Sequence, residues 1–213
     1  GEVGLFVARL GLDGNWDWAV SIDNTTTEVT GFDIDADGNA YFSGLHLQIP
    51  QGTTNTFEWN NTVYHRLDTQ ATSFVAKVNS DGTEGYLQRF TTSNIDALAV
   101  NDNGQVLIAG AMAGSRIKHI GFHQYCINSQ FDIFILRLGT DGVCISHSSA
   151  SNAGGDVAPY ASQTVSDIIF DENDDGFYLT GRFSGEFKLG TGTSGVTRHE
   201  DDSRCAGGNT CFD

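Results

Sequence analysis

Two short motifs recur three times along the chain, and this repetition limits the fold more than any other feature of the sequence. The first motif reads LFVARLGLDG at 5–14, SFVAKVNSDG at 73–82 and IFILRLGTDG at 133–142. The second motif follows each copy of the first and reads FDIDADGNAYFSG at 32–44, LAVNDNGQVLIAG at 98–110 and IIFDENDDGFYLTG at 168–181. Repeats at this spacing indicate an array of similar units that pack against their neighbours.

The first motif is typical of a β-hairpin. In its second copy the apolar residues Phe74, Ala76 and Val78 stand at every second position, which is the period of a β-strand. The pair Asp81-Gly82 tolerates a positive φ and therefore predicts a tight turn, after which a second strand follows.

The second motif has the same form, with Asn103-Gly104 at its turn, and a further extended piece follows the third copy at 182–189. Each repeat thus has four or five strands, and no segment shows the period of an amphipathic helix. A unit of this kind must stack on its neighbours, and radial stacking of four-stranded sheets makes a β-propeller. We expect an all-β fold of about three tandem four-stranded antiparallel repeats, with blades at 1–68, 69–130 and 131–211.

The strings FVAKVNSDG, VNDNGQVLIAG and GRFSGEFKLG resemble the SBBP-type β-propeller repeats of secreted and surface proteins from bacteria and archaea. The resemblance covers nearly the whole chain, and Trp16 and Trp18 stand where that family often has an aromatic residue in the second strand. Propellers typically have 4 to 8 blades. Three repeats therefore predict an incomplete propeller segment, with residues 212–213 entering a next repeat. The remaining blades are expected from a longer chain or, alternatively, from neighbouring subunits.

The chain is acidic, with a net charge of −16 from 27 acidic and 11 basic residues. Such a surface repels phosphate backbones, so we do not expect a nucleic-acid partner. No run of 18 or more apolar residues is present, so membrane insertion is not expected either. We interpret the acidity as a source of solubility or an adaptation to salty water, with binding of a cationic partner or a divalent metal as the alternative.

All four cysteines lie in the second half of the chain, at Cys126, Cys144, Cys205 and Cys211. No C-x-x-C pair occurs, which disfavours a zinc ribbon or a redox motif. Four cysteines allow three disulfide connectivities, of which the simplest pairs the first with the second and the third with the fourth. Disulfides, together with glycosylation sequons at Asn24 and Asn60, indicate a glycoprotein in an extracellular or cell-surface location.

Three aspartates, Asp33, Asp35 and Asp37, precede a glycine and match the start of an EF-hand loop. An EF-hand requires a glutamate at the twelfth position, where this chain has Gly44. The second repeat has Asn101 in place of Asp35, and both residue types favour turns by bonding to nearby backbone. We interpret the string as a hairpin turn and keep a calcium site at the three aspartates as the alternative. No other cofactor is expected.

Other patterns in the sequence do not support a catalytic or cofactor site. The string GTGTSG at 190–195 matches a dinucleotide fingerprint, but no helical period follows it. His119, His123 and Cys126 lack an evident fourth zinc ligand. No G-x-S-x-G nucleophile motif is present. We therefore assign no residue to catalysis or cofactor binding.

The expected function is that of a non-catalytic extracellular or cell-surface module with a structural, adhesive or binding role. Residues shared between repeats explain folding, whereas the insertions at 51–72 and 114–130 differ and are expected to contact a protein or glycan partner. One alternative is part of a propeller enzyme or lectin whose site needs further blades. Another is an assembly or filament subunit that completes its propeller with a neighbouring chain.

Overall fold

The computed structural model describes residues 4–22, 27–46, 56–65, 72–91, 93–112, 117–120, 124–127, 133–152, 163–171, 176–183, 186–189 and 196–199. All regular structure in these ranges is β-strand, and every strand pair is antiparallel. The all-β antiparallel class predicted from the repeats is confirmed. The described part holds no helix, and so none that is long and apolar enough to cross a membrane.

Each strand pairs with its neighbour in sequence as a hairpin, and each repeat supplies three hairpins. The first hairpins hold the first motif: β1 (Leu5–Leu10) with β2 (Trp16–Ile22), β7 (Thr72–Val78) with β8 (Glu84–Thr91), and β13 (Ile133–Leu138) with β14 (Cys144–Asn152). The second hairpins hold the second motif: β3 (Thr27–Ile34) with β4 (Ala40–His46), β9 (Ser93–Val100) with β10 (Val106–Met112), and β15 (Gln163–Asp171) with β16 (Gly176–Phe183). The third hairpins are shorter: β5 (Thr56–Trp59) with β6 (Thr62–His65), β11 (Ile117–Ile120) with β12 (Gln124–Ile127), and β17 (Glu186–Leu189) with β18 (Val196–His199).

Two sheets of six strands form the centre of the molecule. Sheet I has the order β3-β4-β7-β8-β11-β12, and sheet II has the order β9-β10-β13-β14-β17-β18. The expectation of four strands per sheet was wrong. Sheet I includes β11–β12 from the segment 114–130, which was expected to be an insertion, and sheet II includes β17–β18, of which only the extended piece at 182–189 was expected. Strands of four residues are too short to show a clear alternation of apolar and polar positions.

The sheets are offset from the sequence repeats. Each sheet joins the second hairpin of one repeat to the first and third hairpins of the next repeat, through the pairs β4 with β7 and β10 with β13. Sheet I therefore crosses the repeat boundary at 69, and sheet II crosses the boundary at 131.

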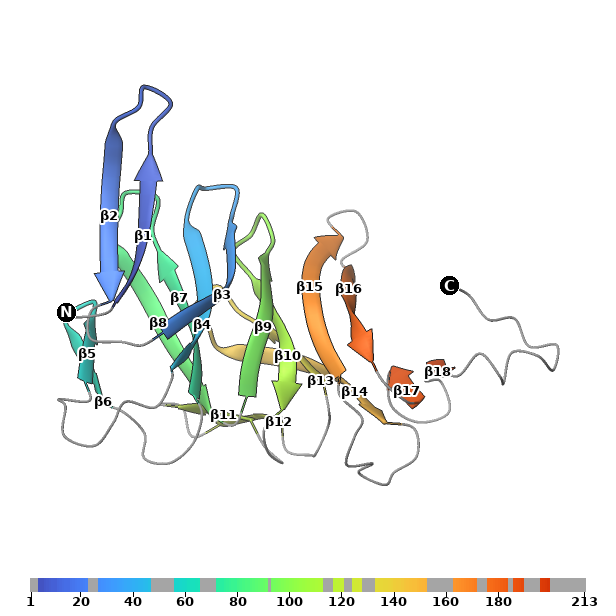
Figure 1. Ribbon diagram of the computed structural model, residues 1–213. Helices are drawn as coiled ribbons and strands as arrows, with labels where there is room; N and C mark the ends of the chain where they lie inside the picture. Colours follow the sequence, from blue (N-terminus) through green and yellow to red (C-terminus); the bar gives the residue numbers. More distant parts are fainter. Residues whose placement is uncertain are drawn as a thin grey trace.

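The hairpins and sheets stack side by side. The β1–β2 hairpin, sheet I, sheet II and the β15–β16 hairpin follow one another from left to right in Figure 1. The turns of the β1–β2, β3–β4 and β9–β10 hairpins point toward the top of this view. Strand β9 contacts β3, β4 and β7, and β15 contacts β9 and β10. None of the described sheets closes on itself.

A layer of buried side chains lies at each of the three junctions. One layer joins the β1–β2 hairpin to sheet I, a second joins sheet I to sheet II, and a third joins sheet II to the β15–β16 hairpin. Successive residues of a strand point to opposite layers, so that Phe74 packs toward the β1–β2 hairpin and Val75 toward sheet II. Each sheet is thus apolar on both faces, which is why the units depend on their neighbours.

Candidate functional site

The turns of the first hairpins share one structure in all three repeats. The N–H of a glycine in the left-handed region, at Gly14, Gly82 and Gly142, donates to the carbonyl three residues earlier. The aspartate just before each glycine accepts a hydrogen bond from the N–H of the residue just after that glycine, at distances of 2.9–3.0 Å. These hydrogen bonds hold the pKa values of Asp13 and Asp81 below the usual range, the bonds from Asn15 and Thr83 being the main cause. The repeated aspartates therefore serve the turns.

The turn of the β3–β4 hairpin uses its first residue, Asp35, in a different way. Asp35 Oδ1 accepts the N–H groups of Asp37 and Asn39 at 3.1 and 2.9 Å, and Oδ2 accepts from the Asn39 amide and the Tyr41 hydroxyl at 2.8 and 2.9 Å. Burial is the largest single effect and raises the pKa of Asp35, but the bonds from Asn39 and Tyr41 outweigh it and hold the pKa below its usual value. In the second repeat Asn101 forms the same two backbone bonds without a charge.

The three aspartates considered for calcium do not share a common set of contacts. Asp35 is buried and its two oxygens are occupied within the turn. Asp33 accepts the N–H of Ile34 with Oδ1 and the N–H of Val100, on β9 of sheet II, with Oδ2. Asp37 is exposed. In the part of the chain that the structure describes, no three His, Cys, Asp or Glu residues are grouped so that they could hold a metal ion.

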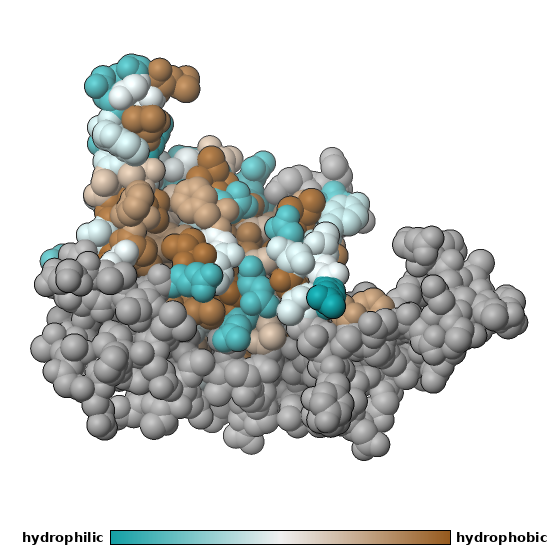
Figure 2. All heavy atoms as spheres, in the orientation of Figure 1, coloured by the Kyte–Doolittle hydropathy of each residue, from teal (hydrophilic) through white to brown (hydrophobic). Residues whose placement is uncertain are grey.

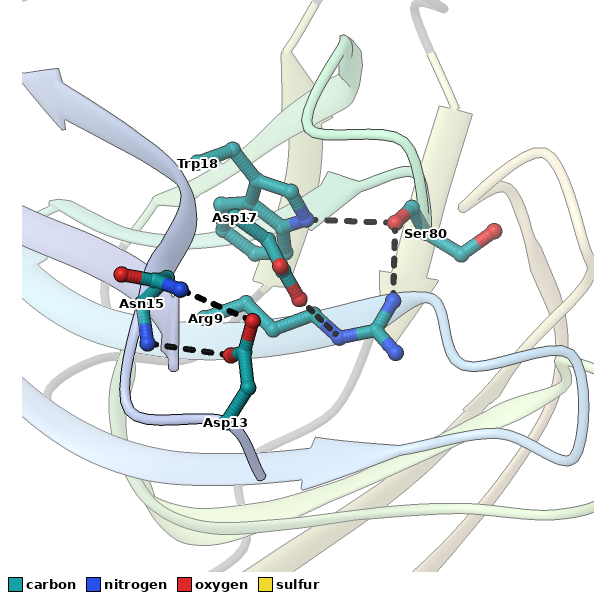
Figure 3. A network of polar contacts seen from close by, with 6 residues as sticks. All are labelled: Arg9, Asp13, Asn15, Asp17, Trp18 and Ser80. Carbon is teal, nitrogen blue, oxygen red and sulfur yellow. Dashed lines mark hydrogen bonds and ion pairs between the residues drawn. The ribbon is translucent and has the colours of Figure 1, made fainter. Parts of the chain in front are cut away.

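Side chains of one repeat bind the turn of the next. Trp18 Nε1 and Arg9 Nη1 both donate to the carbonyl oxygen of Ser80, at 3.1 and 3.3 Å, and Arg9 also pairs with Asp17 at 3.2 Å (Figure 3). The Trp18 ring lies directly against Gly82, where an added Cβ would stand 2.5 Å from Trp18 Cγ. The turn of the second repeat is therefore fixed by residues of the first.

The same arrangement recurs one repeat later with different residues. Tyr86 stands at the position of Trp18, and its ring lies against Gly142, where an added Cβ would be 2.7 Å from Tyr86 Cε2. Gln88 Nε2 donates to the carbonyl oxygen of Asp141 at 3.1 Å. In the third repeat the equivalent position holds Ser146, which has no ring to offer a following turn.

A shallow groove lies beside Ser146, between sheet II and the β15–β16 hairpin. It encloses about 100 Å³, and its walls come from β10, β13, β14, β15 and β16, with Leu107, Ile135, Arg137, Ser146, His147, Ser148, Phe170, Gly176 and Phe177. Sites for small organic ligands usually enclose about 300–1,000 Å³. This groove is therefore small for such a ligand.

The β5–β6 hairpin presents an exposed tip on a buried anchor. Trp59 is buried, packs edge-on against Phe42 with 5.8 Å between ring centroids, and donates from Nε1 to the Gly85 carbonyl. Asn60 and Asn61 follow with φ of 48° and 55°, which is typical of a two-residue turn between strands. The Asn60 N–H donates to the Glu84 carboxylate. The predicted glycosylation residue Asn60 is thus solvent-exposed at a hairpin tip, which its Asn-Asn pair could have indicated.

The predicted disulfide and glycosylation residues are only partly described. Cys144 is half-buried and packs against the core between sheets I and II, and no cysteine among the described residues is free. Strand β12, which holds Cys126, contacts β14, which holds Cys144. Cys205, Cys211 and Asn24 lie outside the described residues.

No protein-family model matches the chain, and no characterised protein matches it at a significant level.

Proposed function

We propose that the chain is a β-propeller segment that acts as a non-catalytic structural and binding module outside the cell. The observation that supports this proposal most directly is the use of the polar groups that the repeats share. Asp35, Asp81 and their equivalents form the turns. Asp33 and Trp18, which the other repeats do not share, join neighbouring units. The repeated chemistry builds a stack of sheets, which is the role of the repeats in a propeller.

The face-to-face order of the sheets supports the propeller arrangement. Neighbouring sheets pack through apolar faces, and β9, the edge strand of sheet II, lies against β3 and β4 of sheet I. In every repeat the chain passes to the neighbouring sheet between its first and its second hairpin, from β2 to β3, from β8 to β9 and from β14 to β15. A constant step with a constant rotation is how a ring of blades is generated.

The exposed tip of the β5–β6 hairpin is the part of the described surface that best fits a binding role. Its two asparagine side chains project from a turn that Trp59 holds in place. Loops and tips on a rigid scaffold commonly carry binding residues. We propose that this tip contacts a glycan or a protein on a cell surface or in an extracellular matrix.

An extracellular location agrees with two features of the described residues. The exposed position of Asn60 leaves room for a glycan. A Cys126–Cys144 disulfide, which we also propose, would join the edge strand β12 of sheet I to β14 of sheet II, and these strands are in contact. Such a bond persists in an oxidising compartment.

The proposal is tested by binding assays on the wild-type chain and on an Asn60→Gly/Asn61→Gly variant. Glycine keeps the two positive φ angles and removes both side chains, so the circular dichroism spectrum should not change while binding on a glycan array or to extracellular proteins falls. Asn103→Asp, at an exposed turn remote from this tip, is the control and should bind as the wild type does. Hydrolysis of any substrate in a glycosidase panel by the wild type, or its failure to bind any partner, contradicts the proposal.

A further inference from the structure

The two ends of the stack are complementary halves of a sheet. In sheets I and II a second hairpin pairs with the following first hairpin, β4 with β7 and β10 with β13. Among the described strands, β1 has no second hairpin on its outer edge, and β16 has no first hairpin on its outer edge. The open edge of β16 is therefore of the kind that β1 lacks as a partner, and the reverse also holds. Open strand edges are ready sites for pairing.

The outer face of the β1–β2 hairpin is apolar and uncovered. Phe6 is 73% exposed, whereas Phe134 at the same position of the third repeat is 0% exposed. Leu10 and Trp16 on this face are also exposed, whereas Leu138, the equivalent of Leu10, is buried. Hydrophobic side chains are visible on the projecting hairpin in Figure 2.

Strand β3 is uncovered on the same side. Phe32 is 55% exposed, whereas its equivalent Leu98 in the second repeat is 6% exposed. Leu98 is covered because the preceding sheet packs on it, and no described strand packs on Phe32 in this way. The apolar position that a neighbouring sheet buries in the second repeat is thus exposed in the first repeat.

The opposite end shows the matching surface. Tyr178 on β16 is 61% exposed, whereas Tyr41 at the same position of the first repeat is 0% exposed. Both hydroxyls donate to the aspartate that begins their turn, Asp171 and Asp35, at 3.2 and 2.9 Å. Tyr41 also lies under Lys77 of the next first hairpin, with Nζ 5.4 Å from the ring centroid. Tyr178 has the same hydrogen bond but no such hairpin beside it.

We propose that a second copy of this chain docks head to tail on the first, with its β16 paired antiparallel to β1. The register follows from the two internal examples, in which Gly44 stands opposite Phe74 and Gly110 opposite Phe134. The same register places Gly181 of the second copy opposite Phe6 and Tyr178 of the second copy opposite Arg9. Arg9 then lies over the Tyr178 ring as Lys77 lies over Tyr41.

The sizes of the side chains at this junction favour a copy of the same chain as the occupant. Inside the stack the small Cys144 and the large Tyr86 both pack against the core between sheets I and II. At the proposed junction their positions are taken by the large Trp16 and by the small Ser146 of the second copy, which borders the shallow groove. Large and small residues exchange places, so the total volume is kept.

The contact uses different surfaces on the two copies, so it builds either a closed ring or an open filament. Each copy contributes sheets I and II. Its β1–β2 hairpin and the β15–β16 hairpin of the neighbouring copy form one further, composite sheet, which makes three sheets per copy. Two copies joined at both ends would hold six sheets, within the range of about 4 to 8 blades known for propellers. The inference stands apart from the proposed glycan or protein binding, because it uses none of the β5–β6 tip.

The test uses two variants, each blocked at a different end of the stack. Phe6→Asp places a charge on the β1–β2 face, and Tyr178→Lys places a like charge opposite Arg9. Both residues are exposed in the single chain, so neither change should alter its circular dichroism spectrum. Asn103→Asp is the control, because it adds a carboxylate at an exposed turn where the first repeat already has Asp37.

Sedimentation equilibrium of the wild type and the control should show a mass that rises with concentration to two or more chains. Each blocked variant alone should lose at least tenfold in association constant. A mixture of the two variants should recover a one-to-one pair and nothing larger, because each retains the surface that the other has lost. A wild type that stays a single chain at all concentrations overturns the proposal and leaves a flanking repeat of the same polypeptide as the occupant. Association that survives both variants, or a mixture that does not pair, also overturns it.

Discussion

The β1–β2 and β13–β14 hairpins have the same sequence pattern but different surroundings. Phe134, Leu136 and Leu138 on β13 are buried against sheet I, whereas Phe6 and Leu10 on β1 face solvent. The turns are nonetheless alike, with the same hydrogen bonds and a glycine in the left-handed region. The difference shows that the local pattern determines the hairpin, while the neighbouring sheet determines which of its faces becomes core.

The largest difference between these hairpins is expected for the shared phenylalanine. Phe134→Ala leaves a cavity between sheets I and II and should lower the free energy of unfolding by about 3–5 kcal/mol. Phe6→Ala, measured at a concentration where the chain is single, removes an exposed ring and should cost less than about 0.5 kcal/mol. Urea denaturation of both variants checks the pair. Equal losses would mean that β1 is covered in solution even in the single chain.

A second comparison concerns the turn glycines Gly14 and Gly82, which have the same φ of 84°. A Cβ at Gly14 meets nothing within 4 Å, so Gly14→Ala should cost only the strain of the left-handed conformation, about 1–2 kcal/mol. A Cβ at Gly82 would collide with Trp18, so Gly82→Ala should cost about 1–3 kcal/mol more.

The excess for Gly82 should vanish when Trp18 is replaced by glycine, which also removes the Trp18 Cβ that would stand 2.6 Å from the added Cβ. Denaturation of Gly82→Ala, of Trp18→Gly and of the double variant gives this coupling directly. An excess that remains without Trp18 would show that the contact between repeats is not its cause.

The smallest expected effect concerns the charge that distinguishes the β3–β4 turn from the β9–β10 turn. Asp35→Asn copies the Asn101 arrangement and removes a carboxyl whose pKa is lowered by folding. A lowered pKa stabilises the fold above the unfolded value of about 3.9, and this stabilisation is lost as the pH falls through the folded value. The stability gap between wild type and variant should therefore be widest near neutral pH and narrow below about pH 4. A gap that stays constant from neutral to acid pH would show that the charge of Asp35 is not involved.

The sequence was sufficient for the features that depend on neighbours along the chain. Alternation in Phe74, Ala76 and Val78 predicted β7, and the glycine at 82 predicted its turn, because both are local properties of the backbone. The resulting strand class and the position of the first and second hairpins agree with the structure. The aspartates at 33–37 lie in and next to a turn for the same local reason.

Features that depend on distant contacts could not be read in this way. The six-strand order joins β4 to β7 across 25 intervening residues, and no local pattern specifies that partner. The contact of Trp18 with Gly82 needs two repeats to be placed side by side. The β5–β6 hairpin is an intermediate case, because Asn60-Asn61 between TFEW and TVYH is a turn signal that was outweighed by the shortness of the strands.

The offset between repeat and sheet makes the unit of sequence different from the unit of folding. A single excised repeat would contain one hairpin of each kind, but its second hairpin would lack the first hairpin of the next repeat, and its first hairpin would lack the second hairpin of the preceding repeat, so it should not fold alone. Local unfolding of one repeat opens two sheets at once, which should spread the transition over neighbouring repeats and raise its cooperativity. Inserting one whole repeat into the array, in contrast, adds one complete sheet and leaves every other pairing unchanged. The number of repeats can therefore change without any change in the strand pairings between repeats.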